Sequence, residues 1–216
     1  MTFAQTATET IAEGHGTTTA LRKPYITPYA EETVELPLTF ERVGGVDWLA
    51  YRDALPDEWM FGVLWARCGT ARNGTILWPL VHTLRQRRCM LKGLCRVCGE
   101  SATDPGTGRL WWVMRSAPPV DDPAPWQTVG PPTCREHVTE ALTACPHLRR
   151  GKPFVCTVGD YTPTGVLANL YGCGDGGRMV ETRHQVMLDL DETHLMPRAL
   201  ATQLIVSLRD IRPEIV

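Results

Sequence analysis

The stretch Leu94-Cys95-Arg96-Val97-Cys98-Gly99 places two cysteines two residues apart, with a glycine directly after the second. Two thiolates at this spacing on a tight turn can bind one metal ion, and glycine readily adopts the positive φ angle that such a turn needs. A single Cys-x2-Cys pair is a weak signal. Its meaning depends on the cysteines and histidines elsewhere in the chain.

Cys134 and His137 form a second pair of ligand-type residues, at the expected start of a helix. Residues three positions apart share a helix face, and a helix N-terminus favours the negative charge of thiolates. The order of knuckle, hairpin and helix N-terminus resembles the treble-clef zinc finger, whose four ligand positions match Cys95, Cys98, Cys134 and His137. We expect one tetrahedral structural zinc ion here, the alternative being thiols that bind no metal.

Cys145 lies eleven residues after Cys134, or about 16 Å along an unbroken helix, too far to share an ion with it. We expect Cys145 to pack as a small apolar group and His147 to cover the helix end. Two alternatives remain open: a second metal site, or a break in the helix that brings Cys145 or His147 to the first ion. The second site would draw on Cys145, His147, Cys156 or Cys173. Cys68 and Cys89 have no paired spacing and are expected in the core.

Around the cysteines, the chain of 216 residues divides into an expected flexible tail, residues 1–22, and a single domain, residues 23–216, with a zinc module at about 93–150. The expected fold class is α+β, a mixed fold in which this treble-clef-like module is inserted in a small antiparallel-sheet domain. The expected strands are Thr33–Phe40, Trp59–Leu64, Arg109–Arg115, Phe154–Val158, Val166–Tyr171 and Met179–Leu190. The expected helices are Asp47–Ala54, Thr75–Lys92 ending at Gly93, one from Thr133 to Pro146, and His194–Asp210. A proline-rich loop over 118–132 and a glycine-rich turn over 172–177 complete the prediction.

The formal net charge of -2 conceals an uneven distribution along the chain. Residues 1–62 carry ten acidic and four basic side chains, whereas residues 63–133 carry nine basic and four acidic ones. Two basic clusters flank the predicted zinc module and are candidates for binding an anion or nucleic acid, with Trp111 or Trp112 available for stacking if exposed. They consist of Arg85, Arg87, Arg88, Lys92 and Arg96, and of Arg149, Arg150 and Lys152. The alternatives are solvated surface cations, or a basic section that docks on the acidic N-terminal part.

A catalytic alternative rests on four residues near the C-terminus: His184, Asp189, Asp191 and His194. Their types suit a metal or a general base. On an extended strand, however, His184 and Asp189 point to opposite faces. Asp191 and Thr193 also suit the caps of the expected final helix, so a structural role is favoured.

Four stretches of the chain resemble a group of uncharacterised actinobacterial zinc-binding proteins. They are residues 94–99, Trp111-Trp112-Val113-Met114, Pro131-Pro132-Thr133-Cys134 and Cys145-Pro146-His147-Leu148. The resemblance covers residues 94–148 and implies zinc but no activity. In that group the second pair is more often Cys-x2-Cys, and the His137 seen here is a chemically mild departure because imidazole is an ordinary zinc ligand.

The sequence therefore predicts a zinc-stabilised cytosolic binding or scaffold protein for a macromolecular partner, with a protein favoured over nucleic acid. The cytosol is expected because thiols stay reduced there, and because the longest apolar run, Trp59–Ala66, is far shorter than the roughly 20 residues of a membrane span. A closed four-ligand site is usually structural, which counts against a zinc hydrolase. The first alternative is a nucleic-acid-binding regulator, and the second is an enzyme with a site near His184, Asp189 and Asp191.

Overall fold

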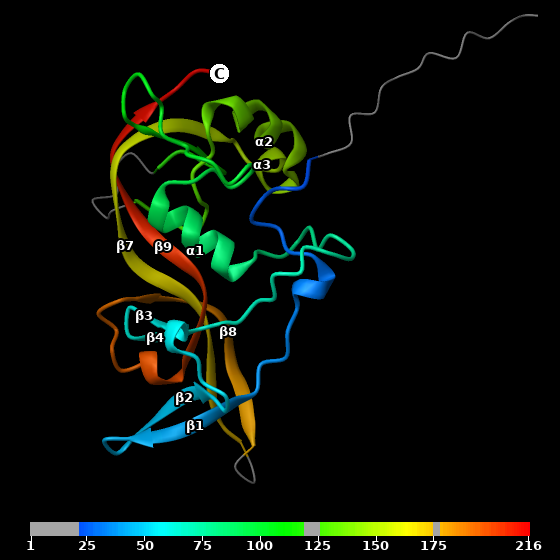
Figure 1. Ribbon diagram of the computed structural model, residues 1–216. Helices are drawn as coiled ribbons and strands as arrows, with labels where there is room; N and C mark the ends of the chain where they lie inside the picture. Colours follow the sequence, from blue (N-terminus) through cyan, green and yellow to red (C-terminus); the bar gives the residue numbers. More distant parts are fainter. Residues whose placement is uncertain (1–21, 119–125, 175–177) are drawn as a thin grey trace, which may run out of the picture.

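The computed structural model describes residues 22–118, 126–174 and 178–216 (Figure 1). Residues 1–21 of the predicted tail, 119–125 of the proline-rich loop and 175–177 of the glycine-rich turn lie outside them. The fold is mostly sheet with few helices. The helices are α1 (Thr83–Lys92), α2 (Val138–Ala144) and α3 (Pro146–Arg149), with short 3-10 turns at Ala30–Glu32, Pro56–Glu58, Arg135–His137 and Met196–Arg198. The strands are β1 (Leu38–Val43), β2 (Val46–Tyr51), β3 (Trp59–Met60), β4 (Val63–Trp65), β5 (Leu110–Met114), β6 (Trp126–Thr128), β7 (Phe154–Cys173), β8 (Met179–Asp189) and β9 (Ala199–Pro213).

Two long antiparallel strands, β7 and β9, form the centre of the larger sheet, whose strand order is β3-β4-β9-β7-β5 (Figure 1). β7 also pairs with β5 near its start and with β8 near its end, and β9 pairs with β6. All these pairings are antiparallel except the one between β4 and β9. The antiparallel sheet expected from the sequence is therefore present.

β9 corrects the expected C-terminal helix His194–Asp210, since residues 199–213 are a strand. The prediction relied on Leu200, Leu204 and Leu208 at helical spacing. Ala201, Ile205 and Val206 between them are buried as well, because both faces of this central strand are covered. A strand buried on both faces has a continuous apolar run without period-two alternation, and such a run does not distinguish strand from helix. Asp191 and Thr193 consequently cap no helix there.

β7 joins the two strands predicted at Phe154–Val158 and Val166–Tyr171 into one. Pro163 interrupts the apolar pattern between them, and the register with β9 shifts between Pro163 and Gly165. Proline cannot donate a ladder hydrogen bond and is tolerated in strands at such irregularities. The strand bends here rather than ending.

β1 and β2 form a separate hairpin and correct the expected helix Asp47–Ala54. Gly44 and Gly45 connect the strands with φ angles of 59° and 83°. Positive φ at both central residues is typical of the two-residue turns that match the twist of a hairpin. The Gly-Gly pair between two apolar runs was the signal for this hairpin.

α1 is shorter than the helix predicted over Thr75–Lys92, because it begins only at Thr83, after the cap residue His82. Pro79 lies in a turn before it, where the Leu80 N–H donates to Leu77 O at 2.9 Å. A proline in a helix interior would remove a hydrogen bond and clash with the preceding turn. The predicted end is confirmed, since Gly93 adopts a left-handed conformation with φ 60°.

β5 confirms the strand predicted at Arg109–Arg115, and it separates two apolar clusters. Trp112 and Met114 pack in the large cluster around β7 and β9. Trp111 and Val113 pack with the knuckle, α2 and α3 in a second cluster. Because successive side chains of a strand point to opposite faces, one short strand serves both clusters.

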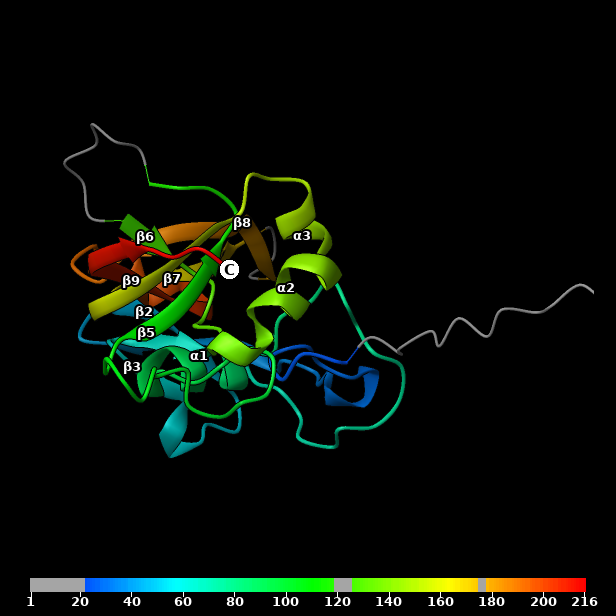
Figure 2. The same ribbon diagram turned by 90° about the horizontal axis from the view of Figure 1, so that it is seen from above.

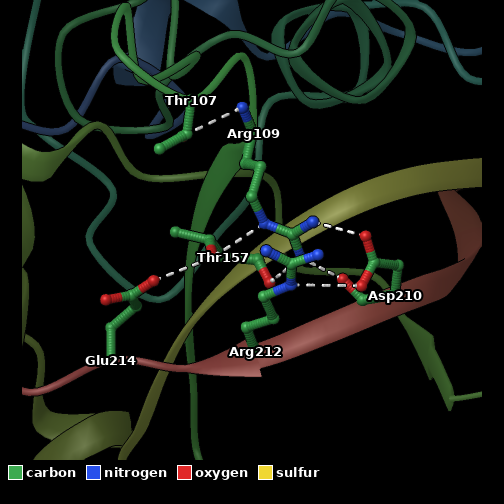
Figure 3. Close-up of polar contacts among 6 residues, drawn as sticks. All are labelled: Thr107, Arg109, Thr157, Asp210, Arg212 and Glu214. Atoms are coloured by element: carbon green, nitrogen blue, oxygen red, sulfur yellow. Dashed lines mark hydrogen bonds and ion pairs between the residues drawn. The ribbon is translucent and has the colours of Figure 1, made fainter.

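Arg109, at the start of β5, links the ends of three strands (Figure 3). Its guanidinium donates to the Asp210 carboxylate on β9, and to the hydroxyl and carbonyl oxygens of Thr157 on β7, each at 3.1 Å. The Thr157 hydroxyl in turn donates to Glu214 at 2.9 Å. This network fixes the register of β5, β7 and β9 at one end of the sheet.

None of the helices in the described ranges is long and apolar enough to cross a membrane.

Candidate metal centre

Cys95, Cys98, Cys134 and His137 converge, with one ligand atom of each within 4.8 Å of the others. Cys95 is fully buried and the other three are partly buried. The cluster brings together the two pairs that the sequence predicted, and it can hold a metal ion. Among the residues that the structure describes, it is the one group of this kind.

The first pair lies on a tight turn that is closed by backbone hydrogen bonds. The Cys95 N–H donates to Glu100 O at 2.7 Å, and the Gly99 N–H donates to Cys95 O at 2.8 Å. Gly99 has φ 82°, the conformation for which a glycine was expected. The Val97 N–H also points at Cys95 Sγ, 3.3 Å away, and a donor aimed at sulfur favours the thiolate form.

The second pair lies at the start of the 3-10 turn Arg135–His137, which leads directly into α2. Cys134 Sγ lies 2.9 Å from His137 Nδ1 and 3.9 Å from Cys98 Sγ. The imidazole therefore turns Nδ1 toward the thiols. The spacing of three residues brings both side chains to the same side of the turn, as the sequence indicated.

Without a cation, the environment of the thiols disfavours their charged form. Burial and the adjacent Cys95 raise the pKa of both Cys98 and Cys134 above the usual value of a thiol. A bound dication reverses this effect, because it deprotonates coordinating thiols outright. Three soft sulfur donors and one imidazole are also a donor set that zinc commonly takes. The residues present therefore fit such an ion.

The outer nitrogen of His137 faces two charged residues. Arg22 Nη1 lies 2.6 Å from Nε2, and Glu140 Oε2 lies 3.9 Å from it. If Nδ1 binds a metal, Nε2 carries the proton and needs an acceptor. Arg22 can only donate, and the Glu140 carboxylate, 3.9 Å away, has to move closer to accept this hydrogen bond. Neither Arg22 nor Glu140 was predicted from the sequence. The position of Glu140, three after His137 on the same helix face, was the available signal.

The cluster is embedded in the apolar core that Trp111 and Val113 of β5 share with α2 and α3. Val97, Ala102, Val138, Ala141 and Leu148 complete this core. Figure 2 shows α2 and α3 next to each other beside the strands. The ligands thus connect the knuckle to the start of α2 over a small core of their own.

The remaining cysteines are dispersed. Cys145 ends α2 and packs at the edge of the small core, as expected, and Pro146 begins α3 directly afterwards. Cys89 and Cys156 are buried, Cys68 is only partly buried, and Cys173 and His147 are exposed. All eight cysteines carry free thiols. No second metal-type cluster with Cys145 or His147 forms among the described residues.

Three of the eight predicted anion-binding cations make internal contacts. Arg85 is buried against Glu32, the Arg87 guanidinium lies 4.6 Å from the ring centroid of Trp65, and Arg96 donates to Val113 O at 2.8 Å. The exposed members are Arg88, Lys92, Arg149, Arg150 and Lys152. Trp111 and Trp112 are both buried, so neither ring is available for stacking on a base.

The residues of the catalytic alternative are spread along the surface. His184 pairs with Glu181 at 2.8 Å, and its imidazole is 66% exposed. Asp189 lies five residues further along β8, which corresponds to about 16 Å on a strand. Asp191 and His194 are exposed in the following turn. Within the described ranges these residues form no metal-type cluster.

No protein-family model, curated protein or solved structure matches this chain. The resemblance to uncharacterised actinobacterial zinc-binding proteins therefore stays a prediction from residues 94–148.

Proposed function

We propose that Cys95, Cys98, Cys134 and His137 bind one structural zinc ion in a treble-clef-like module. The main support is that four soft or borderline ligand atoms lie within 4.8 Å of one another. Four protein ligands fill a tetrahedral zinc site and leave no position for a substrate or a reactive water. The order of knuckle, short hairpin, strand and helix start supports the treble-clef-like arrangement.

The ion would supply folding energy rather than chemistry. The small core around Trp111 and Val113 holds few side chains, and its two halves are separated in sequence by β5, β6 and their connections. A metal that joins the knuckle to the start of α2 closes this long loop in the folded state, so its binding energy becomes folding energy.

We further propose that the protein is a cytosolic binding module for a macromolecular partner, and that this partner is a protein. Free thiols on all eight cysteines suit a reducing compartment. The burial of both β5 tryptophans and the internal contacts of three arginines weaken the nucleic-acid alternative. The enzyme alternative has no support from a cluster of its residues.

The turn between β3 and β4 supports a protein partner. Phe61 occupies this turn with φ 57°, a conformation that a bulky residue rarely adopts, and its side chain is 38% exposed. Trp59, in the same hairpin, is equally exposed and packs against Trp48 at a ring-centroid distance of 5.7 Å. Backbone strain that displays an aromatic side chain is more typical of a binding surface than of a connection.

Elemental analysis of the purified protein tests the zinc site. We expect about one zinc per chain in the wild type and in Cys173→Ser, which alters an exposed thiol. Cys98→Ser should lose the metal and melt at a lower temperature, because removal of a ligand removes folding energy. A wild type without zinc, or a Cys98→Ser variant with unchanged zinc and melting temperature, would contradict the proposal.

Affinity purification from the native cell tests the partner. We expect a protein that binds the wild type directly when both are purified, and that is lost in the double variant Trp59→Ser and Phe61→Ser while zinc content stays normal. The matched control is Val43→Ser, an exposed apolar position on the β1–β2 hairpin. Binding to nucleic acid instead, with affinity that falls steeply as salt rises, would favour the regulatory alternative.

A further inference from the structure

A surface hollow beside the knuckle collects cationic and aromatic side chains from three distant parts of the chain. It has a volume of about 300 Å³ and borders Cys98 and Val97. Its other side chains come from the segment that follows Arg22, from the loop before α1 and from α1 itself. Those that carry the argument are Arg22, Lys23, Tyr25, Tyr29, Arg72 and Arg85. A neighbouring hollow of about 210 Å³ shares Tyr25, Arg72 and Arg85 and adds Arg88.

The charge around this hollow is positive in excess. Arg85 is compensated by the buried carboxylate of Glu32. In the described part of the chain, no carboxylate forms an ion pair with Arg22, Lys23, Arg72 or Arg88. Consistently, partial burial, then the Arg85 and Arg72 charges, lower the pKa of Lys23 to about 8 against the pull of Glu32. An anion in the hollow would relieve this repulsion.

The cations are held in place before any ligand arrives. The Arg85 guanidinium donates to Tyr25 O at 2.7 Å and to Thr27 O at 3.0 Å, as well as to Glu32. Lys23 Nζ lies 3.3 Å from the ring centroid of Tyr29, and the Arg72 guanidinium lies 5.6 Å from that of Tyr25. Such cation–π contacts orient a charge without neutralising it.

The backbone around Arg72 and Tyr25 is equally constrained. Arg72 has φ 47°, in the left-handed region that a non-glycine residue seldom occupies. Its loop is tied to the 3-10 turn Ala30–Glu32, since the Ala30 N–H donates to Thr75 O at 2.8 Å. The Tyr25 N–H donates to Val97 O at 2.9 Å, so the knuckle supports the floor of the hollow. A residue with a strained backbone, in a fixed loop that lines a hollow, is typical of a functional site.

We propose that this hollow binds a phosphate monoester, with Arg22, Lys23 and Arg72 as the groups that contact the phosphate. Their convergence on one compact space suits a single dianion, whereas a nucleic-acid strand requires cations spread along a track. Tyr25 and Tyr29 line the same hollow and hold the cations through their rings. This site goes beyond the proposed zinc site and does not depend on the protein partner. The two sites adjoin, since Arg22 contacts His137 and the hollow borders Cys98.

Calorimetric titration of the full zinc-loaded chain at constant ionic strength tests the site. The probes are inorganic phosphate, O-phosphotyrosine and adenosine 5′-monophosphate, with chloride as the reference anion. We expect saturable binding of one phosphate-bearing probe per chain, with a dissociation constant of about 1 mM or below. Tighter binding of O-phosphotyrosine would identify a phosphorylated side chain as the source of the phosphate, and tighter binding of adenosine 5′-monophosphate would identify a nucleotide.

Variants distinguish this site from general attraction to a cation-rich surface. Arg72→Gln and Lys23→Gln should each weaken binding about tenfold or more, since each removes a charge-assisted hydrogen bond. Lys92→Gln and Arg149→Gln remove the same charge at exposed positions away from the hollow and should change affinity less than about twofold. Zinc content and melting temperature, measured on the same samples, report separately on the metal site.

Three results would overturn the proposal: no saturable binding by any probe, equal weakening by Lys92→Gln and Arg72→Gln, or tight binding of a 20-nucleotide single strand without binding of the monoesters. Normal zinc content with no phosphate binding would refute the hollow as a site and leave the zinc proposal intact. Phosphate binding in a preparation that holds no zinc would support the hollow and refute the metal site.

Discussion

The side-chain amide of Gln86 on α1 pairs with the backbone of Leu204 on β9, 118 residues later in the chain. Gln86 Nε2 donates to Leu204 O, and the Leu204 N–H donates to Gln86 Oε1, both at 2.9 Å. On this edge of β9, the pairing with β4 ends at Ala201 and the pairing with β6 begins at Val206. The buried amide thus supplies the two hydrogen bonds that a strand would have made across the gap.

Replacement of Gln86 should lower the stability of the fold. Gln86→Ala leaves both polar groups of Leu204 unpaired, together with Val129 O, to which Gln86 Nε2 also donates at 2.8 Å. We expect the free energy of unfolding to fall by about 2 to 4 kcal/mol, because buried groups without partners keep their desolvation penalty. Urea unfolding measures the change. Gln127→Ala is the control, since its two contacts are long, 3.3 and 3.4 Å, and its loss should cost under about 1 kcal/mol. Equal losses in the two variants would contradict this role.

Glu140 should orient His137 in the metal-bound protein. Glu140→Gln replaces the carboxylate that can approach Nε2–H as its acceptor with a weaker amide acceptor, and loss of such partners typically weakens metal affinity by about 10- to 100-fold. Competition with a chromogenic chelator measures the zinc affinity. Glu136→Gln makes the same change at an exposed position one residue before His137 and should leave the affinity unchanged. An unaltered affinity in Glu140→Gln would show that Nε2 has another acceptor.

Lys23 should react unusually fast with acylating reagents. With a pKa of about 8 rather than 10.5, roughly half of its amines are neutral at pH 8, and the neutral amine is the nucleophile. Mass spectrometry after brief treatment with acetic anhydride should show more acetylation at Lys23 than at the exposed Lys92.

Because a bound phosphate stabilises the charged amine of Lys23, it should raise the pKa of Lys23 and slow its acetylation. For the same reason, phosphate affinity should fall as the pH rises through 8. A Lys23 no faster than Lys92, or one indifferent to phosphate, would contradict this account.

Gly159 on β7 should be intolerant of a side chain. A Cβ atom there would meet the Asp210 carboxylate and lie 2.9 Å from Arg109 Nη1, so Gly159→Ala has to separate this ion pair (Figure 3). We expect a loss of about 1 to 3 kcal/mol in the free energy of unfolding, typical of overpacking. Gly172→Ala, on the same strand, is the control. Its Cβ would contact only a Thr182 methyl group at 3.1 Å, and its effect should be clearly smaller. Equal effects in thermal or urea unfolding would show that the pair adapts without cost.

The candidate metal cluster could be predicted from sequence because its geometry is local. Two ligands on one turn and two at the start of one helix are fixed by spacing, and the chain between them only has to bring two ready pairs together. The end of α1 at Gly93 and the strand at β5 were predictable for the same reason, since a left-handed cap and an apolar run bounded by turns are short-range features.

The rest depended on long-range contacts. β9 has the apolar spacing of a helix because both its faces are covered by other parts of the fold. Gln86 is an ordinary polar residue of a helix until the gap between β4 and β6 is known. Arg72 lies about fifty residues after the adjacent Arg22 and Lys23, and only the folded chain shows that the three share one hollow. Conversely, Arg85 and Arg87 were grouped with solvent-facing cations because their sequence neighbours are basic, although buried partners hold them.

The position of β5 between two cores limits how this chain can change in length during evolution. Trp111 and Trp112 point in opposite directions, one toward the candidate metal cluster and one toward β7 and β9. An inserted residue within β5 would exchange the two rings between environments of different shape, and neither neighbour could compensate alone. The turn over Asp104–Gly108, in which Pro105, Gly106, Thr107 and Gly108 are exposed, can absorb the same insertion. Homologues that diverge in length are therefore expected to do so in that turn, while the two tryptophans keep their order.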